Sequence, residues 1–180
     1  MKQQLRLSGS GGQGVITAAI IFAEAAVAAG LEAVQSQSYG PEARGGASKS
    51  EVIISDEAIY HPHVETPDLV LAMTQKAADK YYGDLKDDGL LVLDEQLVPN
   101  PPAYPHTLRI PITQLAVDTL GKTLFANIVA LGALVRLTGL VSLDAVRESV
   151  ANRVPPHTAE RNMKALQVGW DAADKALQAG

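Results

Sequence analysis

Short apolar runs separated by turn-forming residues dominate the first two-thirds of the chain. Leu69–Met73 and Leu90–Leu93 are continuous apolar segments, as expected of strands that are buried on both faces of a sheet. Four further strands are predicted, at Gln3–Ser8, Ala33–Ser36, Glu51–Ile54 and Leu108–Ile110. These strands are spaced so that helices fit between several of them.

Helical segments alternate with the strands and fill the last third of the chain. Val15–Ala29 is apolar and is followed by Gly30, which tolerates the left-handed conformation that ends many helices. In the run Leu124–Leu137, the small residues Gly132 and Ala133 permit close packing. The remaining predicted helices, each with its capping residue, are Thr74 to about Tyr82, Leu143–Ala151 after Ser142, and Ala159 to about Gln178 after Thr158.

This alternation predicts the α/β class, with a Rossmann-like three-layer fold. A mainly parallel sheet is expected to lie between helices, followed by a helical C-terminal part. At 180 residues the chain is long enough for one well-buried domain, so we expect residues 1–180 to form a single domain.

The segment GSGGQG, residues 9–14, is the first candidate binding site. Gly9, Gly11 and Gly14 match the pattern Gly-x-Gly-x-x-Gly, and Gly12 adds another glycine. The segment joins the first strand to a helix, where glycines allow the backbone to approach a phosphate and the helix start attracts an anion. The position favours phosphate binding, with Ser10 and Gln13 included, over a tight turn that binds nothing.

The end of the second predicted strand argues against NAD. NAD-binding folds carry Asp or Glu there to hold the ribose hydroxyls, whereas Glu32 comes too early and Glu42 too late. NADP remains open, because Ser36 or Arg44 could meet a 2′-phosphate.

The segment YGPEARGG, residues 39–46, is the second candidate site. Tyr39 offers an aromatic face and a hydroxyl, and Arg44 offers a forked donor suited to phosphate or carboxylate. Gly45 and Gly46 allow close approach of the backbone to a ligand. A solvated surface turn is the alternative, but a loop after the second strand can reach the same sheet edge as the glycine segment.

Composition and charge exclude several functions. The chain has no cysteine, so disulfides, thiolate nucleophiles and cysteine-bound iron–sulfur clusters are absent, and a reducing cytoplasm is the expected compartment. The net charge of −5 opposes broad nucleic-acid binding. Glu24 lies inside the apolar run Val15–Ala29, which argues against a signal peptide, and the run Leu124–Val135 contains Asn127 and is too short to span a bilayer. Both runs are expected to be buried helices.

Isolated polar residues give weaker signals. His61 and His63 lack further ligands at a recognisable spacing, so a metal site is not expected. Asp68 and Asp94 do not form a defined carboxylate pair for acid–base catalysis. Asn127 lies on an apolar helix, where it either contacts a ligand or satisfies a buried backbone group.

Taken together, GSGGQGVITAA (residues 9–19) and SYGPEARGG (residues 38–46) resemble the gamma subunits of 2-oxoacid:ferredoxin oxidoreductases. The run ANIVALGA (residues 126–133) and the C-terminal residues extend this resemblance over essentially the whole chain. The two loops together indicate this family far more specifically than either loop does alone.

The resemblance implies a role in the oxidative decarboxylation of a 2-oxoacid to an acyl-coenzyme A, with electrons passed to ferredoxin. Thiamine diphosphate and iron–sulfur clusters would belong to companion alpha and beta subunits, with a possible delta or ferredoxin-like subunit. This chain would bind coenzyme A, with phosphates at Gly9–Gly14 and positive charge from Arg44, and would be inactive alone. The 2-oxoacid is not fixed by this chain, although the likeness leans towards 2-oxoglutarate.

Two other functions stay open at this point. A stand-alone NADP-dependent oxidoreductase would use the same glycine turn, although no catalytic constellation accompanies it. A scaffold or regulatory subunit would use the glycines for packing alone.

Overall fold

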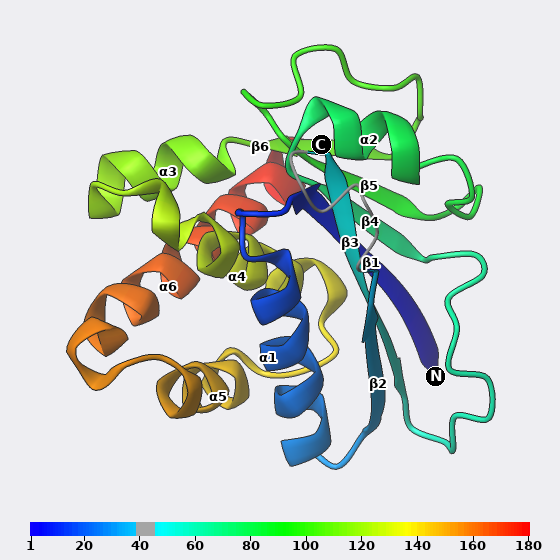
Figure 1. Ribbon diagram of the computed structural model, residues 1–180, viewed down its shortest axis with the longest axis horizontal. Helices are drawn as coiled ribbons and strands as arrows, with labels where there is room; N and C mark the ends of the chain where they lie inside the picture. Colours follow the sequence, from blue (N-terminus) through cyan, green and yellow to red (C-terminus); the bar gives the residue numbers. More distant parts are fainter. Residues whose placement is uncertain (39–45) are drawn as a thin grey trace.

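Six strands form one mixed sheet in the computed structural model, which describes residues 1–38 and 46–180. The order across the sheet is β2-β3-β1-β4-β5-β6 (Figure 1). The strands are β1 (Lys2–Ser10), β2 (Glu32–Gln37), β3 (Ala47–Ser55), β4 (Leu69–Ala72), β5 (Leu90–Asp94) and β6 (Thr107–Ile110).

The sheet is mainly parallel, as predicted, with one reversed strand. β1, β4, β5 and β6 pair in parallel, whereas β3 is antiparallel to both of its neighbours. Only residues 38–46 connect β2 and β3, and a connection this short suits an antiparallel return better than a parallel crossover.

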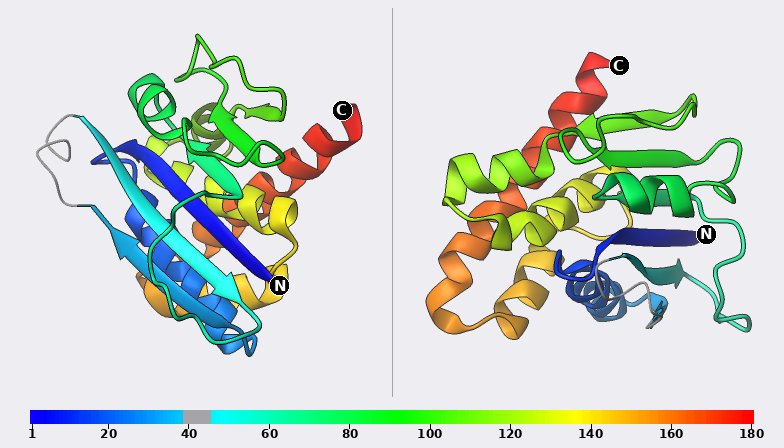
Figure 2. Two further views of the ribbon diagram at one scale, coloured as in Figure 1. Left: turned by 90° about the vertical axis from the view of Figure 1, so that its right-hand side faces the viewer. Right: turned by 45° about the horizontal axis from the view of Figure 1, so that its top comes forward.

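Helices cover the two faces of the sheet unequally (Figure 2). Five of them lie on one face, and α2 lies on the other with the connection that precedes β6. The helices are α1 (Val15–Ala28), α2 (Gln75–Tyr81), α3 (Ile112–Leu120), α4 (Ala126–Thr138), α5 (Leu143–Arg153) and α6 (Ala159–Ala179). The predicted three-layer arrangement and helical C-terminal part are confirmed.

Strand β4 shows why the central strands are apolar throughout. Leu69 and Leu71 pack into the apolar cluster under the five helices, while Val70 and Ala72 pack against α2. Because successive side chains of a strand point to opposite faces, both sets must be apolar when both faces are covered.

Helices α4 and α6 cross at very close range. A Cβ atom added to Gly132 would lie 2.0 Å from the carbonyl oxygen of Leu166, and one added to Gly169 would lie 1.8 Å from that of Val129. The two glycines therefore let the helix backbones touch, as the small residues of the sequence predict.

Two of the three predicted helix caps are present. The hydroxyl oxygens of Thr74 and Ser142 accept hydrogen bonds from the backbone N–H groups of Ala77 and Ala145. The prediction for Thr158 is wrong, because its hydroxyl donates to the carbonyl oxygen of Pro155 instead. Thr158 ends the 3-10 turn Pro156–Thr158 and has helical φ and ψ, so its side chain cannot reach forward to cap α6.

Arg6 carries a buried charge on the α2 face of β1. Its side chain is bonded to Glu51 at 2.8 Å, to the carbonyl oxygen of Tyr81 at 3.0 Å, and to both carboxylate oxygens of Asp84. Burial acts to raise the pKa of Asp84, but the hydrogen bonds and charge of Arg6 outweigh it and lower that pKa. This cluster anchors the C-terminal end of α2 to the sheet.

Candidate functional site

The carboxyl ends of the parallel strands bring the first candidate loop together with the starts of three helices. β1 leads into the glycine turn and α1, and β6 leads into α3, which is followed by the 3-10 turn Thr123–Phe125 and α4. In open α/β sheets this edge is the usual place for a ligand. In Figure 1 the glycine turn, α3 and α4 lie together on one side of the strands.

The glycine turn is shaped by Gly14 and by the side chain of Gln13. Gly14 has a φ of 74°, in the left-handed region, and directly precedes α1. The side-chain oxygen of Gln13 accepts from the Ser10 N–H at 2.8 Å, and its amide donates to the Met73 carbonyl oxygen at 3.2 Å. These two bonds fix the turn against the ends of β1 and β4.

The strand-to-helix turn is shorter than the sequence predicts. Gly9 and Ser10 belong to β1, so the turn itself comprises residues 11–14. A Cβ atom on Gly9 would lie 2.4 Å from the side-chain oxygen of Gln13, so this glycine makes room for the bonds that shape the turn. Gly11 and Gly12 are exposed.

A cavity of about 410 Å³ lies where the turn meets α3 and α4. Asn127, in the first turn of α4, donates to the carbonyl oxygen of Gly14 at 3.3 Å and so links the two segments. A Cβ atom on Gly14 would lie 2.7 Å from the Asn127 amide nitrogen, which adds a second reason for glycine there. The cavity is lined by Gly12, Gln13, Gly14, Thr17, Thr113, Thr123, Leu124, Ala126 and Asn127.

The structure shows one of the two roles considered for Asn127, because its amide donates to a backbone carbonyl oxygen. The residue also lines the cavity, and its contact with a ligand stays a prediction. The three threonines in the lining were missed by the sequence reasoning. Of the three, only Thr17 could have been predicted from its position, because it lies in the first turn of the helix that follows the glycine segment.

Buried Asp94 holds the start of α3 in place. Its carboxylate accepts hydrogen bonds from the backbone N–H groups of Gln96 and Leu97, each at 3.1 Å. It also accepts from the backbone N–H and the hydroxyl of Thr113, at 2.9 and 2.7 Å. With four donors already on it, Asp94 orients the cavity wall and is not available as a general base.

The cavity suits an anion. None of its lining residues is charged, and the first turn of α1 carries neither an acidic residue nor a side-chain cap. The N–H groups at the start of this 14-residue helix therefore keep their partial positive charge, equivalent to roughly +0.5 at the helix end. Lys122, an exposed cation, directly precedes the lining residue Thr123.

The last residue of the second candidate loop, Gly46, lies near the same edge but lines a different cavity. Ser10 pairs with Ala47, so the described end of that loop lies beside the end of β1. Gly46, however, lines a separate cavity of about 380 Å³ with residues of α2. The other three predicted residues, Tyr39, Arg44 and Gly45, lie outside the described residues.

The sheet order also separates this site from a dinucleotide site. In the NAD and NADP folds the second strand lies next to the first, so its end reaches the ribose. Here β3 lies between β1 and β2, which moves the end of β2 one strand further from the glycine turn.

Two further signals were sought in the described part of the chain. Residues 1–38 and 46–180 contain no group of three or more His, Cys, Asp or Glu side chains placed to hold a metal. Within the same residues, no helix has the length and apolar character needed to cross a membrane.

Comparison with known proteins places this geometry in a family. The family described as pyruvate ferredoxin/flavodoxin oxidoreductase matches residues 4–172. The 2-oxoglutarate synthase subunit KorC of Methanocaldococcus jannaschii is 46% identical over 177 residues, which cover 96% of this chain and 95% of that protein. The crystal structure of the keto/oxoacid ferredoxin oxidoreductase gamma subunit from Geobacter sulfurreducens matches with a TM-score of 0.90 and 49% identity, over 98% of each chain.

A longer relative contains the same fold as one part. The 2-oxoglutarate:ferredoxin oxidoreductase from Magnetococcus marinus, solved with 2-oxoglutarate, coenzyme A and succinyl-CoA bound, matches with a TM-score of 0.76 and 25% identity. The match covers 98% of this chain and 30% of that one. On the family match and the full-length likeness to named subunits, this chain belongs to the pyruvate ferredoxin/flavodoxin oxidoreductase family, among the gamma subunits of 2-oxoacid:ferredoxin oxidoreductases.

Proposed function

We propose that this gamma subunit binds the phosphate groups of coenzyme A for companion subunits that oxidise a 2-oxoacid. The observation that carries the proposal is the cavity between the glycine turn and the start of α4, where a helix N-terminus and neutral donors converge. The bound coenzyme A of the Magnetococcus relative supports the choice of ligand.

The residues of this chain fit phosphate better than they fit the reacting part of the cofactor. Helix N–H groups, the Asn127 amide and the Thr17 hydroxyl can donate to phosphate oxygens without bringing a negative charge near them. We assign Gly12–Gly14, Thr17 and Asn127 to the phosphates, and we keep Arg44, Tyr39 and Gly45–Gly46 as further contacts predicted from the sequence.

The chemistry itself belongs to other chains. When bound, coenzyme A supplies a thiol that takes up the acyl group released from the 2-oxoacid. The gamma subunit has no cysteine for an iron–sulfur cluster, and Asp94 at the edge is fully hydrogen-bonded. We therefore place thiamine diphosphate and the clusters on alpha and beta subunits, with or without a delta subunit. We place the complex in the cytoplasm. Among 2-oxoacids, 2-oxoglutarate is our first choice because of the relative from Methanocaldococcus.

Asn127→Asp in the assembled enzyme tests the assignment. A carboxylate in the cavity would remove a donor and repel phosphate, so the KM for coenzyme A should rise by about ten- to a hundredfold. The KM for the 2-oxoacid should stay unchanged, because that substrate is recognised elsewhere. Asn152→Asp, on the exposed part of α5, adds the same charge away from the cavity and is the matched control.

One outcome would reject the site. If Asn127→Asp folds and assembles normally and its KM for coenzyme A equals that of the Asn152→Asp control, the cavity does not hold the phosphates.

A further inference from the structure

The outer edge of β2 is an open strand edge. β2 is the last strand of the sheet and pairs with β3 alone. The N–H of Ser38 donates to the Lys49 carbonyl oxygen at 3.2 Å, which marks a hydrogen-bonded pair in this antiparallel ladder. Because such pairs alternate with non-bonded ones, the backbone N–H and C=O groups of Ala33 and Gln35 point away from β3. Within the described residues, these groups have no backbone partner.

β2 also lacks the features that protect edge strands from pairing. The opposite edge strand, β6, has only four residues, and one of them is an arginine, Arg109. β2 has six residues and contains no proline, lysine or arginine, and its one charged residue, Glu32, stands at its start. Proteins usually place such residues on an exposed edge to prevent it from adding another strand.

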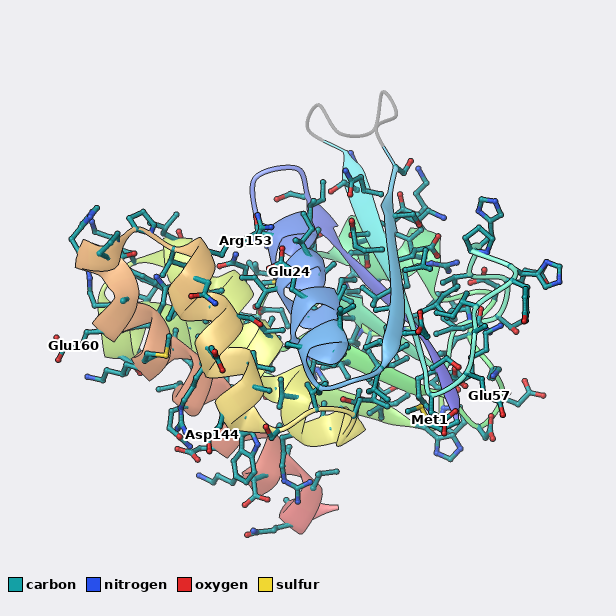
Figure 3. All side chains as sticks on the ribbon, turned by 90° about the horizontal axis from the view of Figure 1, so that it is seen from below. Met1, Glu24, Glu57, Asp144, Arg153 and Glu160 are labelled. Atoms are coloured by element: carbon teal, nitrogen blue, oxygen red, sulfur yellow. The ribbon has the colours of Figure 1, made fainter. Side chains whose placement is uncertain are left out.

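An apolar groove runs beside this edge, between β2 and α1. The groove has a volume of about 450 Å³, and the side chain of Val27 at its rim is 57% exposed. Glu24, the one charged lining residue, is paired with Arg153 of α5, and the two lie together beside α1 in Figure 3. The groove is lined by Ile20, Ala23, Glu24, Val27, Ala28, Ala33 and Gln35.

We propose that a second copy of this chain pairs with β2, so that two sheets join across a two-fold axis at Val34. In this antiparallel register Val34 faces its own counterpart in a non-hydrogen-bonded pair, where side chains approach most closely. Ala33 and Gln35 then face each other across the axis in two hydrogen-bonded pairs, which use the outward backbone groups. The two copies of α1 would cover each other's groove.

The edge is self-complementary in charge as well as in backbone pattern. Antiparallel pairing about Val34 places Glu32 opposite the neutral Ser36 of the second copy, so the two carboxylates lie at opposite ends of the seam. A two-fold contact requires one patch to fit itself, and this strand offers an apolar β-branched residue at the axis with neutral residues on both sides. This pairing does not use the cavity: the first turn of α1 lines the cavity and its later turns line the groove, and no residue lines both.

Cross-linking through a single introduced thiol tests the pairing, because the natural chain has no cysteine. Val34→Cys in the full-length chain, oxidised with copper phenanthroline, should give a covalent dimer on a non-reducing gel. Leu177→Cys, at an exposed apolar position on α6, is the control for non-specific cross-linking and should remain monomeric. Adding Ala33→Pro to Val34→Cys removes an outward N–H without touching the β3 ladder, and should reduce the covalent dimer by about tenfold or more.

Analytical sedimentation of the natural chain gives an independent readout, and we expect it to show a dimer. The substitution Val27→Glu, at the rim of the groove, should shift the equilibrium towards the monomer. The pairing is overturned if the natural chain sediments as a monomer and Val34→Cys cross-links no better than Leu177→Cys. It is also overturned if Val34→Cys, in the assembled enzyme with a cysteine-bearing companion, cross-links to that companion instead of to a second gamma subunit. Circular dichroism of each variant separates loss of pairing from loss of fold.

Discussion

Replacing Gly132 by alanine should force apart the two helices at the centre of the helical layer. The added Cβ would lie 2.0 Å from the carbonyl oxygen of Leu166, whereas ordinary van der Waals contact begins at 3.4 Å. The atom it meets belongs to the backbone of α6 and cannot rotate away. The nearby contact of Gly169 with Val129 resists any sliding of one helix along the other.

Two opposing effects set the size of the loss. Alanine is a better helix former than glycine by about 0.8–1 kcal/mol, which stabilises the variant. Overpacking of a dense core costs about 1–3 kcal/mol in stability. A clash with backbone atoms should cost as much as the upper end of this range or more. We therefore expect a net loss of about 2 kcal/mol in the free energy of unfolding, or a fall in Tm of about 4–8 °C for a chain of this size.

Urea unfolding followed by far-UV circular dichroism measures the effect. Gly83→Ala is the matched control, because no atom lies within 4 Å of a Cβ added there and Gly83 does not have a left-handed φ. That variant should be as stable as the natural chain. If Gly132→Ala unfolded at the same urea concentration as Gly83→Ala, the tight crossing of α4 and α6 would not exist in solution.

Two more predictions concern charged residues. Because Arg6 holds the pKa of Asp84 below its usual 3.8, the pair's stabilisation is present above that value and is lost as pH falls through the lowered pKa. At neutral pH, Asp84→Asn should therefore unfold at a lower urea concentration than the natural chain. The difference between the two unfolding midpoints should shrink between about pH 5 and pH 2. A difference that stays constant over this range would contradict the stabilising role of the Arg6–Asp84 pair. Arg44→Ala should weaken coenzyme A binding to the assembled enzyme by about ten- to a hundredfold, with Arg44→Lys recovering only part. Unchanged affinity in Arg44→Ala would remove Arg44 from the site.

Patterns within one short segment predicted a strand or helix correctly where the burial of its own faces or its own capping residue determines the structure. β4 was predicted from a continuous apolar run, which its burial on both faces requires. α2 was predicted from the capping residue Thr74. β3 was predicted at Glu51–Ile54 but begins four residues earlier, at Ala47. Its polar start is buried because the Ser48 and Ser50 hydroxyls donate to backbone carbonyl oxygens of neighbouring strands. Such long-range pairing is invisible to a pattern along one segment.

The same limit applies to the candidate site. The glycine turn and Asn127 were both predicted as cofactor contacts, although 113 residues separate Gly14 from Asn127 and only the fold shows their hydrogen bond. Thr113 and Thr123 carried no local signal, because their place in the cavity depends on how α3 and α4 return to the carboxyl edge. The order of the strands, with β3 between β1 and β2, was likewise outside the reach of local patterns.

The distribution of charge in this chain agrees with the proposal that it binds an anion without catalysing a reaction itself. Several of its charged side chains serve the fold: Arg6 anchors α2, Arg153 ties α5 to α1, and Asp94 holds the start of α3. The cavity, in contrast, is lined by neutral donors and by the positive end of α1. Such a lining suits phosphate and, among the residues that form it, offers no charged side chain. This agrees with our proposal that the oxidation takes place on groups held by other subunits.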